Sequence, residues 1–146
     1  MDSINHLTRG SMTIKVGTDI CSIDRIANAY KRFGQRLLKR LFTENEIAYI
    51  MSAPPHTVAR IAGRFAAKEA ASKCLGTGWY GLSWKEIEIG KKPSGEPTLL
   101  LHGRAIDIAK KRGVDNFEVS ISHEHHYATA TVIASSAGKR SNKSTK

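Results

Sequence analysis

The sequence has only two cysteines and no long apolar segment, and each shortage excludes a class of protein. Cys21 and Cys74 are too few for a disulfide framework or a four-cysteine metal site, so we expect two reduced thiols. No apolar run approaches the roughly 20 residues that a membrane-spanning helix needs. The first residues also lack the basic and then apolar layout of a secretion signal. These features predict a cytoplasmic protein that does not enter the membrane.

Acidic residues are scarce as well. Asp and Glu together number 13 against 23 Lys and Arg, which gives a net charge of +10 at pH 7 and indicates a negatively charged partner. A small nucleic-acid-binding domain is therefore an alternative interpretation. Against it, the aromatic residues are scattered, and no RNP, KH or zinc-finger pattern is present. Walker phosphate loops and Rossmann glycine fingerprints are absent too.

The positive charge is concentrated in one segment of the chain. Between residues 22 and 42, six basic residues stand against Asp24 alone, a local net charge of +5 (six minus one). Residues 138–146 carry four more basic residues. We expect the first segment to meet an acidic partner. Its basic residues are Arg25, Lys31, Arg32, Arg36, Lys39 and Arg40.

The length and composition predict one globular domain. A chain of 146 residues with 40% hydrophobic and 25% charged residues has enough apolar material for one core but not for two. Residues 1–11 show no periodicity and are expected to be a disordered leader or the remnant of an expression tag. The folded domain is predicted over 12–134. Residues 135–146 are expected to be a disordered basic tail.

The hydrophobic periodicity predicts an α+β order of elements with antiparallel pairing and one long central helix. From Met12, Ile14 and Val16 alternate with Lys15, Gly17 and Asp19, which is typical of a half-buried strand that ends near Asp19. The sequence then predicts a helix that Ser22 caps and Gly34 interrupts, followed by a second basic turn through Leu37, Leu38 and Leu41. After these it predicts a helix from 43 to the Pro-Pro pair at 54–55, a long helix over 57–74, a hairpin of strands 84–89 and 98–101, a short helix over 103–112, and a second hairpin of strands 117–123 and 127–133.

Glu69 is the first candidate for chemistry because of its place on the long helix. The apolar stripe of Val58, Ala62 and Phe65 continues directly onto this carboxylate. Glu69 is thus either a buried functional acid or half of an intrahelical pair with Lys73. The spacing of such a pair is favourable and contributes about 0.2–0.5 kcal/mol.

Other polar residues also allow two interpretations. Asp19 lies on a glycine-flanked strand face, where it is either a ligand-binding acid or the cap of the next element. His123 is either a functional group or a hydrogen-bonded core or edge residue, and it is followed by two more histidines at a tight turn whose side chains diverge. Arg60, Arg64 and Lys68 form a ladder that is either a solvated surface or, with Lys73, a phosphate-binding groove.

Three segments resemble the signature segments of the holo-(acyl-carrier-protein) synthases of the 4'-phosphopantetheinyl transferase superfamily. They are residues 16–20 (VGTDI), 63–70 (GRFAAKEA) with Lys73 and 76–78 (GTG), and 119–123 (VSISH). The similarity extends from about residue 12 to residue 134. The resemblance implies a compact α+β domain that assembles as a homotrimer, with coenzyme A bound in clefts between subunits. It also implies transfer of 4'-phosphopantetheine from coenzyme A to a serine of an acyl carrier protein.

The resemblance also implies roles for individual residues. Asp19 and Glu69 match ligands of Mg²⁺, and Lys73 is expected to stabilise charge on the reacting phosphate while either Glu69 or a metal-bound water takes the serine proton. His123 is expected to contact the nucleotide from the adjoining subunit. Arg64 is expected to help bind the phosphates of coenzyme A.

Two more positions follow from the same resemblance. Arg25 matches the residue that docks on the acidic helix of the carrier protein. Cys21 stands where larger relatives, which modify peptide-synthetase carriers, have a third acid. A thiol serves a hard cation poorly, so the resemblance implies a site of two carboxylates and the fatty-acid branch of the family.

Overall fold

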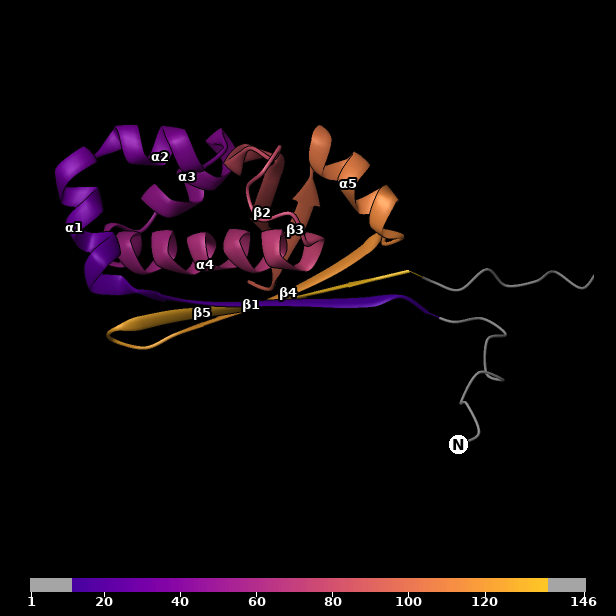
Figure 1. Cartoon of the computed structure of the whole chain (residues 1–146). Coiled ribbons are helices and arrows are strands. Elements are labelled where there is room, and N and C mark those ends of the chain that lie inside the picture. The colour runs from indigo at the N-terminus through magenta and orange to yellow at the C-terminus, as the bar shows by residue number, and fades with distance from the viewer. Residues whose placement is uncertain (1–11, 137–146) are drawn as a thin grey trace, which may run out of the picture.

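The computed structural model describes residues 12–136, which form three layers (Figure 1). The three-stranded sheet is the first layer, α4 lies across it, and the remaining helices and the second sheet cover α4 from the other side. The elements are β1 (Ile14–Ser22), α1 (Ile23–Phe33), α2 (Gln35–Leu41), α3 (Glu44–Met51), the 3-10 turn η1 (Pro54–His56), α4 (Thr57–Leu75), the 3-10 turn η2 (Trp84–Glu86), β2 (Ile87–Lys91), β3 (Pro97–Leu101), α5 (Arg104–Arg112), β4 (Asn116–His123) and β5 (Tyr127–Ser135).

The helix boundaries follow from capping residues that the sequence makes visible. The Ser22 side chain accepts a hydrogen bond from the Arg25 backbone N–H and begins α1. Thr43 and Glu46 form the predicted capping box of α3. Gly34, with φ of 54°, separates α1 from α2, and Gly76, with φ of 76°, ends α4. These predictions are confirmed.

The antiparallel pairing is also confirmed, although the strands form two sheets. One sheet has the order β1-β5-β4, with Asp19 opposite Ala130 and His123 opposite Ala128. The hairpin of β2 and β3 makes the other sheet. The predicted strand over 84–89 begins only at Ile87, because Ser83 and Glu86 close a capping box that turns residues 84–86 into a 3-10 helix.

The predicted alternation of β1 is confirmed, and the structure shows that its apolar face points outward. Ile14 and Val16 are both 63% exposed on the outer face of the sheet, whereas Gly17 and Asp19 face α4. Gly17 explains this orientation, since a β-carbon there would overlap the backbone carbonyl oxygen of Ala70. The strand also continues to Ser22, so Asp19 does not end it.

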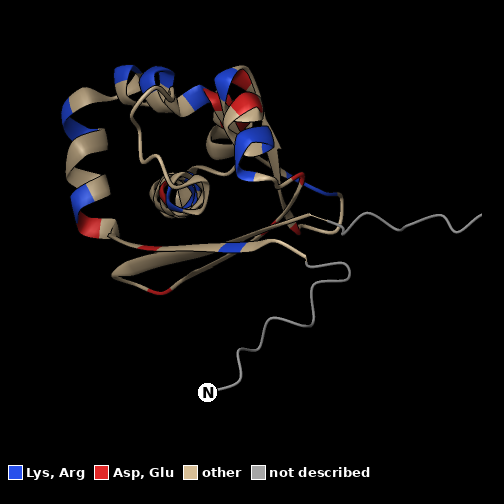
Figure 2. Cartoon of the chain, turned by 45° about the vertical axis from the view of Figure 1, so that its right-hand side comes forward, with Lys and Arg blue, Asp and Glu red and all other residues tan. Residues whose placement is uncertain are grey.

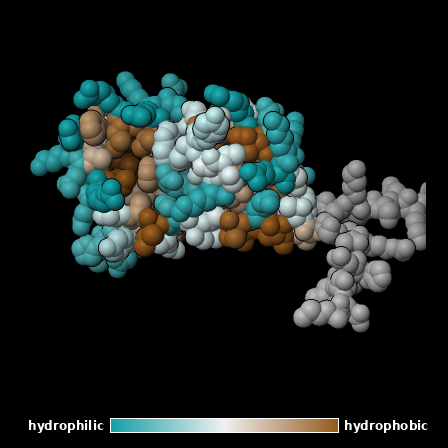
Figure 3. Space-filling model, in the orientation of Figure 1, coloured by the Kyte–Doolittle hydropathy of each residue, from teal (hydrophilic) through white to brown (hydrophobic). Residues whose placement is uncertain are grey.

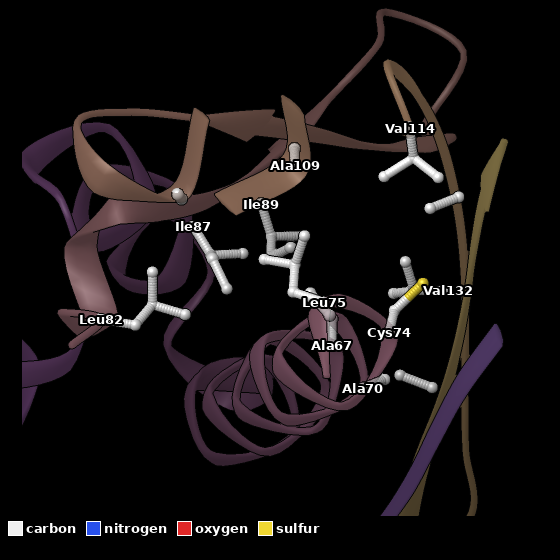
Figure 4. Packing of buried hydrophobic residues seen from close by; sticks show 14 of the residues in the cluster. Ala67, Ala70, Cys74, Leu75, Leu82, Ile87, Ile89, Ala109, Val114 and Val132 are labelled. Carbon is white, nitrogen blue, oxygen red and sulfur yellow. The ribbon is translucent and has the colours of Figure 1, made fainter. Parts of the chain in front are cut away.

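The larger hydrophobic core lies on the inner side of the sheet and surrounds the C-terminal half of α4 (Figure 4). Cys74 of α4 lies beside Val132 of β5, while Leu75 points toward Ile89 of β2 on the other side. A second core joins α1, α2 and α3 to the N-terminal half of α4. Packing against both cores holds α4 in place along its length, so the polar side chains of this helix have defined positions.

Two further expectations, on membrane helices and on the domain boundaries, can be compared with the described residues only. Within 12–136, no helix is long and apolar enough to cross a membrane. The predicted leader over 1–11 and most of the tail over 135–146 lie outside the described residues, so the domain boundaries remain a prediction.

Candidate functional site

Asp19 and Glu69 are 50 positions apart in sequence, yet they line the same open cavity. The cavity measures about 400 Å³ and is also lined by Cys21, Arg25 and Phe65. The close packing of β1 on α4 brings the two carboxylates together. The charge of Asp19 adds to the effect of burial, the larger cause, in raising the pKa of Glu69. Two carboxylates that repel each other at an open cavity are suited to binding a cation.

Lys73 completes this group of charges in a way that decides between the two interpretations of Glu69. Its ammonium group donates to Asp19 Oδ1 at 3.1 Å and to the carbonyl oxygen of Thr18 at 2.9 Å. Among the ion pairs of residues 12–136, Lys73 is joined to Asp19 and not to Glu69. The intrahelical pair with Glu69 is therefore not formed. The Lys73 side chain is 54% exposed, so the ammonium group remains accessible to a ligand.

Glu69 is instead oriented by a residue that the sequence did not indicate. The indole Nε1 of Trp79 donates to Glu69 Oε1 at 3.2 Å, which lowers the pKa of Glu69 against the effect of burial. The Trp79 ring packs on Trp84 with 3.7 Å between centroids, and Trp84 stacks on Phe65 at 5.3 Å. Trp79 lies in a glycine-rich loop without periodicity, so no sequence pattern could have identified it.

Cys21 lies beside the carboxylates as a neutral thiol. Its Sγ donates to the carbonyl oxygen of Ala62 at 3.2 Å. Burial first and the charge of Asp19 second raise the pKa of Cys21 to about 11. In the described part of the chain, no three His, Cys, Asp or Glu residues form a group that could hold a metal ion. Asp19 and Glu69 are therefore the acids that this cavity offers to a cation.

Arg64 and His123 are brought together, but in a different cavity. This second cavity measures about 220 Å³ and is lined by both residues together with His56, Arg60 and the hairpin residue Pro97. Five positions separate Arg64 from Glu69 on α4, which corresponds to a rotation of about 140° around the helix axis. Within one chain, the predicted site residues therefore divide into two groups on different faces of α4.

Arg64 is the most unusual side chain of the second cavity. It is only 6% exposed, its guanidinium carbon lies 3.8 Å from the centre of the Tyr49 ring, and within residues 12–136 its Nε finds no hydrogen-bond partner. Burial lowers the pKa of Arg64 from its ordinary value. Arg60 packs on the same ring at 4.1 Å and donates to the Tyr49 carbonyl oxygen at 2.6 Å. The guanidinium groups of Arg60 and Arg64 both lie against one ring, and the Arg64 Nε–H is free among the described residues. Such a pair is suited to binding an anion.

Lys68 does not belong to a solvated ladder. It is 0% exposed, and its ammonium group donates to Glu46 Oε1 at 2.8 Å and to the carbonyl oxygens of Trp84 at 2.9 Å and Ile87 at 2.7 Å. Glu46 also accepts the Ile89 backbone N–H at 3.0 Å. The solvated interpretation of Arg60, Arg64 and Lys68 was wrong for the two buried members.

Arg25 lies where the basic segment meets the carboxylate cavity. It is exposed on the first turn of α1 and lines the cavity with Asp19 and Glu69. Further basic residues follow it along α1 and α2, shown in blue in Figure 2. A hollowed hydrophobic patch bordered by hydrophilic residues lies between these helices and α4 (Figure 3). The surface thus combines positive charge with an apolar hollow beside the acids.

This arrangement agrees with a family match that extends over most of the chain. Residues 15–132 match the family described as the 4'-phosphopantetheinyl transferase superfamily. The chain belongs to this superfamily. The superfamily relatives include the holo-(acyl-carrier-protein) synthase of Gloeobacter violaceus, 45% identical over 118 residues that cover 81% of this chain and 89% of the relative. The synthase of Koribacter versatilis is 44% identical over 123 residues, covering 84% of this chain and 98% of the relative.

Solved structures of superfamily members have the same fold. The crystal structure of the holo-(acyl-carrier-protein) synthase from Neisseria meningitidis matches with a TM-score of 0.75 and 35% identity, over 82% of this chain and 96% of that chain. The Helicobacter pylori synthase, solved in complex with coenzyme A, matches with a TM-score of 0.72 and 35% identity, over 82% and 98%. The predicted family and the predicted α+β fold are confirmed.

Proposed function

We propose that this superfamily member is a holo-(acyl-carrier-protein) synthase that transfers 4'-phosphopantetheine from coenzyme A to a serine of apo-acyl-carrier protein. The serine hydroxyl attacks the β-phosphate of coenzyme A, a new phosphoester bond forms, and 3',5'-ADP leaves with the electrons of the broken pyrophosphate bond. The observation that carries this function is the meeting of Asp19 and Glu69 at one open cavity, with Lys73 paired to Asp19, in a chain of this superfamily. The alternative of a nucleic-acid-binding domain has no support from the relatives.

Asp19 and Glu69 are the residues that would hold Mg²⁺. They fit the ion because both offer hard oxygen donors, and because a cation between them would offset the burial that chiefly raises the pKa of Glu69 and the smaller effect of the Asp19 charge. When bound, Mg²⁺ supplies charge neutralisation for the pyrophosphate. Two carboxylates are sufficient, since this ion commonly takes its remaining ligands from phosphates and water.

The two remaining roles are stabilisation of charge on the phosphate and acceptance of the serine proton. Lys73 is exposed toward ligand and stabilises negative charge on the phosphate in the transition state. Two acceptors for the serine proton fit the cavity, Glu69 and a water molecule.

Coenzyme A would reach both cavities if a neighbouring subunit supplied the second one. Arg64 and His123 lie away from Glu69 in one chain, so we assign their contacts with the phosphates and the nucleotide to the adjoining subunit of a homotrimer. The outer face of the β1-β5-β4 sheet supports assembly, because it exposes apolar side chains that water would otherwise cover. These exposed residues are Ile14, Val16, Ile20, Tyr127 and Ile133.

The acidic carrier protein is assigned to the surface around Arg25. Positive charge on α1 and α2 would steer an acidic helix, and the apolar hollow beside Arg25 would receive its hydrophobic side chains. The serine would then arrive at the cavity that Arg25 lines. We also assign the protein to the cytoplasm, which is supported by the two free thiols of Cys21 and Cys74.

A direct assay tests the transfer. The protein is incubated with coenzyme A, Mg²⁺ and an apo-carrier protein, and the carrier is weighed by mass spectrometry. We expect the mass to increase by one phosphopantetheine group, and we expect no increase when EDTA is present or when the acceptor serine is replaced by alanine. A carrier of unchanged mass under conditions that sustain a known synthase would contradict the assignment.

A further inference from the structure

The hydrogen bond from Trp79 makes the two carboxylate oxygens of Glu69 different, because only one of them accepts it. Oε1 accepts the indole N–H at 3.2 Å, and among the described residues Oε2 receives no hydrogen bond. Glu69 lines the open cavity with Asp19, so its second oxygen is the one left for a ligand. A residue that engages one carboxylate oxygen limits how many oxygens the group can offer to a cation.

The position of Trp79 is set by aromatic packing. The centre of its ring lies 3.7 Å from the centre of the Trp84 ring, and Trp84 in turn stacks on Phe65. The backbone of Trp84 is anchored as well, because its carbonyl oxygen accepts the buried ammonium of Lys68 at 2.9 Å. The loop itself contains three glycines with positive φ, Gly76, Gly78 and Gly81. The indole is therefore fixed mainly by the ring stack on which it rests.

Magnesium and calcium differ in how they use carboxylates. Mg²⁺ requires near-ideal octahedral geometry with short bonds, whereas Ca²⁺ accepts six to eight oxygens and often takes both oxygens of one carboxylate. A glutamate restricted to a single oxygen therefore disfavours Ca²⁺ more than Mg²⁺. We propose that Trp79 is a specificity-determining residue that makes Glu69 a one-oxygen ligand and so selects Mg²⁺ over Ca²⁺. This inference rests on the proposed function, in which Glu69 is a metal ligand.

The selectivity can be measured without catalysis. Dissociation constants for Mg²⁺ and for Ca²⁺ are determined by isothermal titration calorimetry on the full chain with coenzyme A bound and no carrier protein present. Trp79→Phe keeps an aromatic ring in the stack and removes the N–H. We expect the ratio of the Ca²⁺ constant to the Mg²⁺ constant to fall about 3- to 10-fold, the range that one hydrogen bond of ordinary strength allows. The matched control, Trp84→Phe, keeps the Trp79 donor and should leave the ratio unchanged.

A second variant isolates the N–H from the shape of the ring. In the Trp84→Phe protein, Trp79 is the only tryptophan, so it can be replaced with β-(3-benzothienyl)alanine, which has the outline of indole but no N–H. The ratio should fall here as it does in Trp79→Phe. An unchanged ratio in this variant, or an equal loss of affinity for both metals, would overturn the inference and leave the proposed function intact. A wild-type protein that transfers no phosphopantetheine and binds neither ion would overturn both.

Discussion

Replacing Lys68 with methionine should destabilise the protein strongly, although the two side chains have similar length. The ammonium group of Lys68 makes three hydrogen bonds inside the protein, one to Glu46 and two to the carbonyl oxygens of Trp84 and Ile87. Both charged side chains are 0% exposed. The variant would leave Glu46 as an ionised group without its counter-charge in a site that water does not reach.

The expected size of this effect follows from the kind of interaction that is broken. Removing one partner of a buried ion pair costs about 3–5 kcal/mol of unfolding free energy, a large part of the roughly 5–15 kcal/mol of a typical domain. Two backbone N–H groups, of Thr43 and Ile89, still donate to Glu46, so we expect a value near the lower end. Removing both charges should cost much less, because no unpaired charge then remains.

Urea denaturation followed by circular dichroism measures this difference at one fixed protein concentration, since assembly would otherwise shift the midpoint. Lys68→Met is compared with Glu46→Gln and with the double variant. We expect the double variant to be more stable than Lys68→Met. If the loss of unfolding free energy in the double variant equals the sum of the losses in the two single variants, the two charges are not coupled and the reasoning is refuted.

Four further predictions concern the site. Glu69→Gln should keep the circular dichroism spectrum and abolish metal-dependent transfer, because it removes one of two ligand charges; undiminished turnover at saturating coenzyme A would contradict the assignment. Arg25→Glu should raise the KM for carrier protein at least about tenfold more than that for coenzyme A, since it reverses a docking charge; equal changes in both KM values would count against docking there. Val16→Glu should reduce the oligomer measured by light scattering and lower transfer with it, and an unchanged oligomer would exclude the outer sheet face as the interface. Iodoacetamide should modify Cys21 slowly at pH 7, with a rate that rises as the pH approaches about 11, because the thiolate is the nucleophile; fast alkylation at neutral pH would contradict the raised pKa.

The helices could be predicted from the sequence because their signals are local. Ser22 and Thr43 cap helices through backbone groups three positions away, and Gly76 ends α4 at the residue where the periodicity stops. The inward face of β1 could not be predicted in the same way. Alternation shows which residues share a face, but the choice between faces depends on Gly17, whose missing β-carbon lets α4 approach.

Less of the candidate site than of the fold could be predicted from the sequence. Residue patterns alone left Glu69 and Asp19 with two interpretations each, and the family resemblance supplied their roles. Trp79 and Glu46 were missed because each acts on a residue in another part of the fold. The partner of Lys68 lies 22 positions earlier in the chain, so its burial depends on tertiary packing that no helical pattern describes.

The alternation of β1 joins assembly and metal binding in one strand. Val16 and Ile20 point outward to the proposed subunit interface, while Gly17 and Asp19 point inward to α4. The second cavity, with Arg64, lies on another face of α4 from Asp19 and Glu69, so in the proposed assembly a neighbour would bring it to this pair. A dissociated subunit would keep its own Asp19 and Glu69 at one cavity and would lack only the Arg64 and His123 of its neighbour.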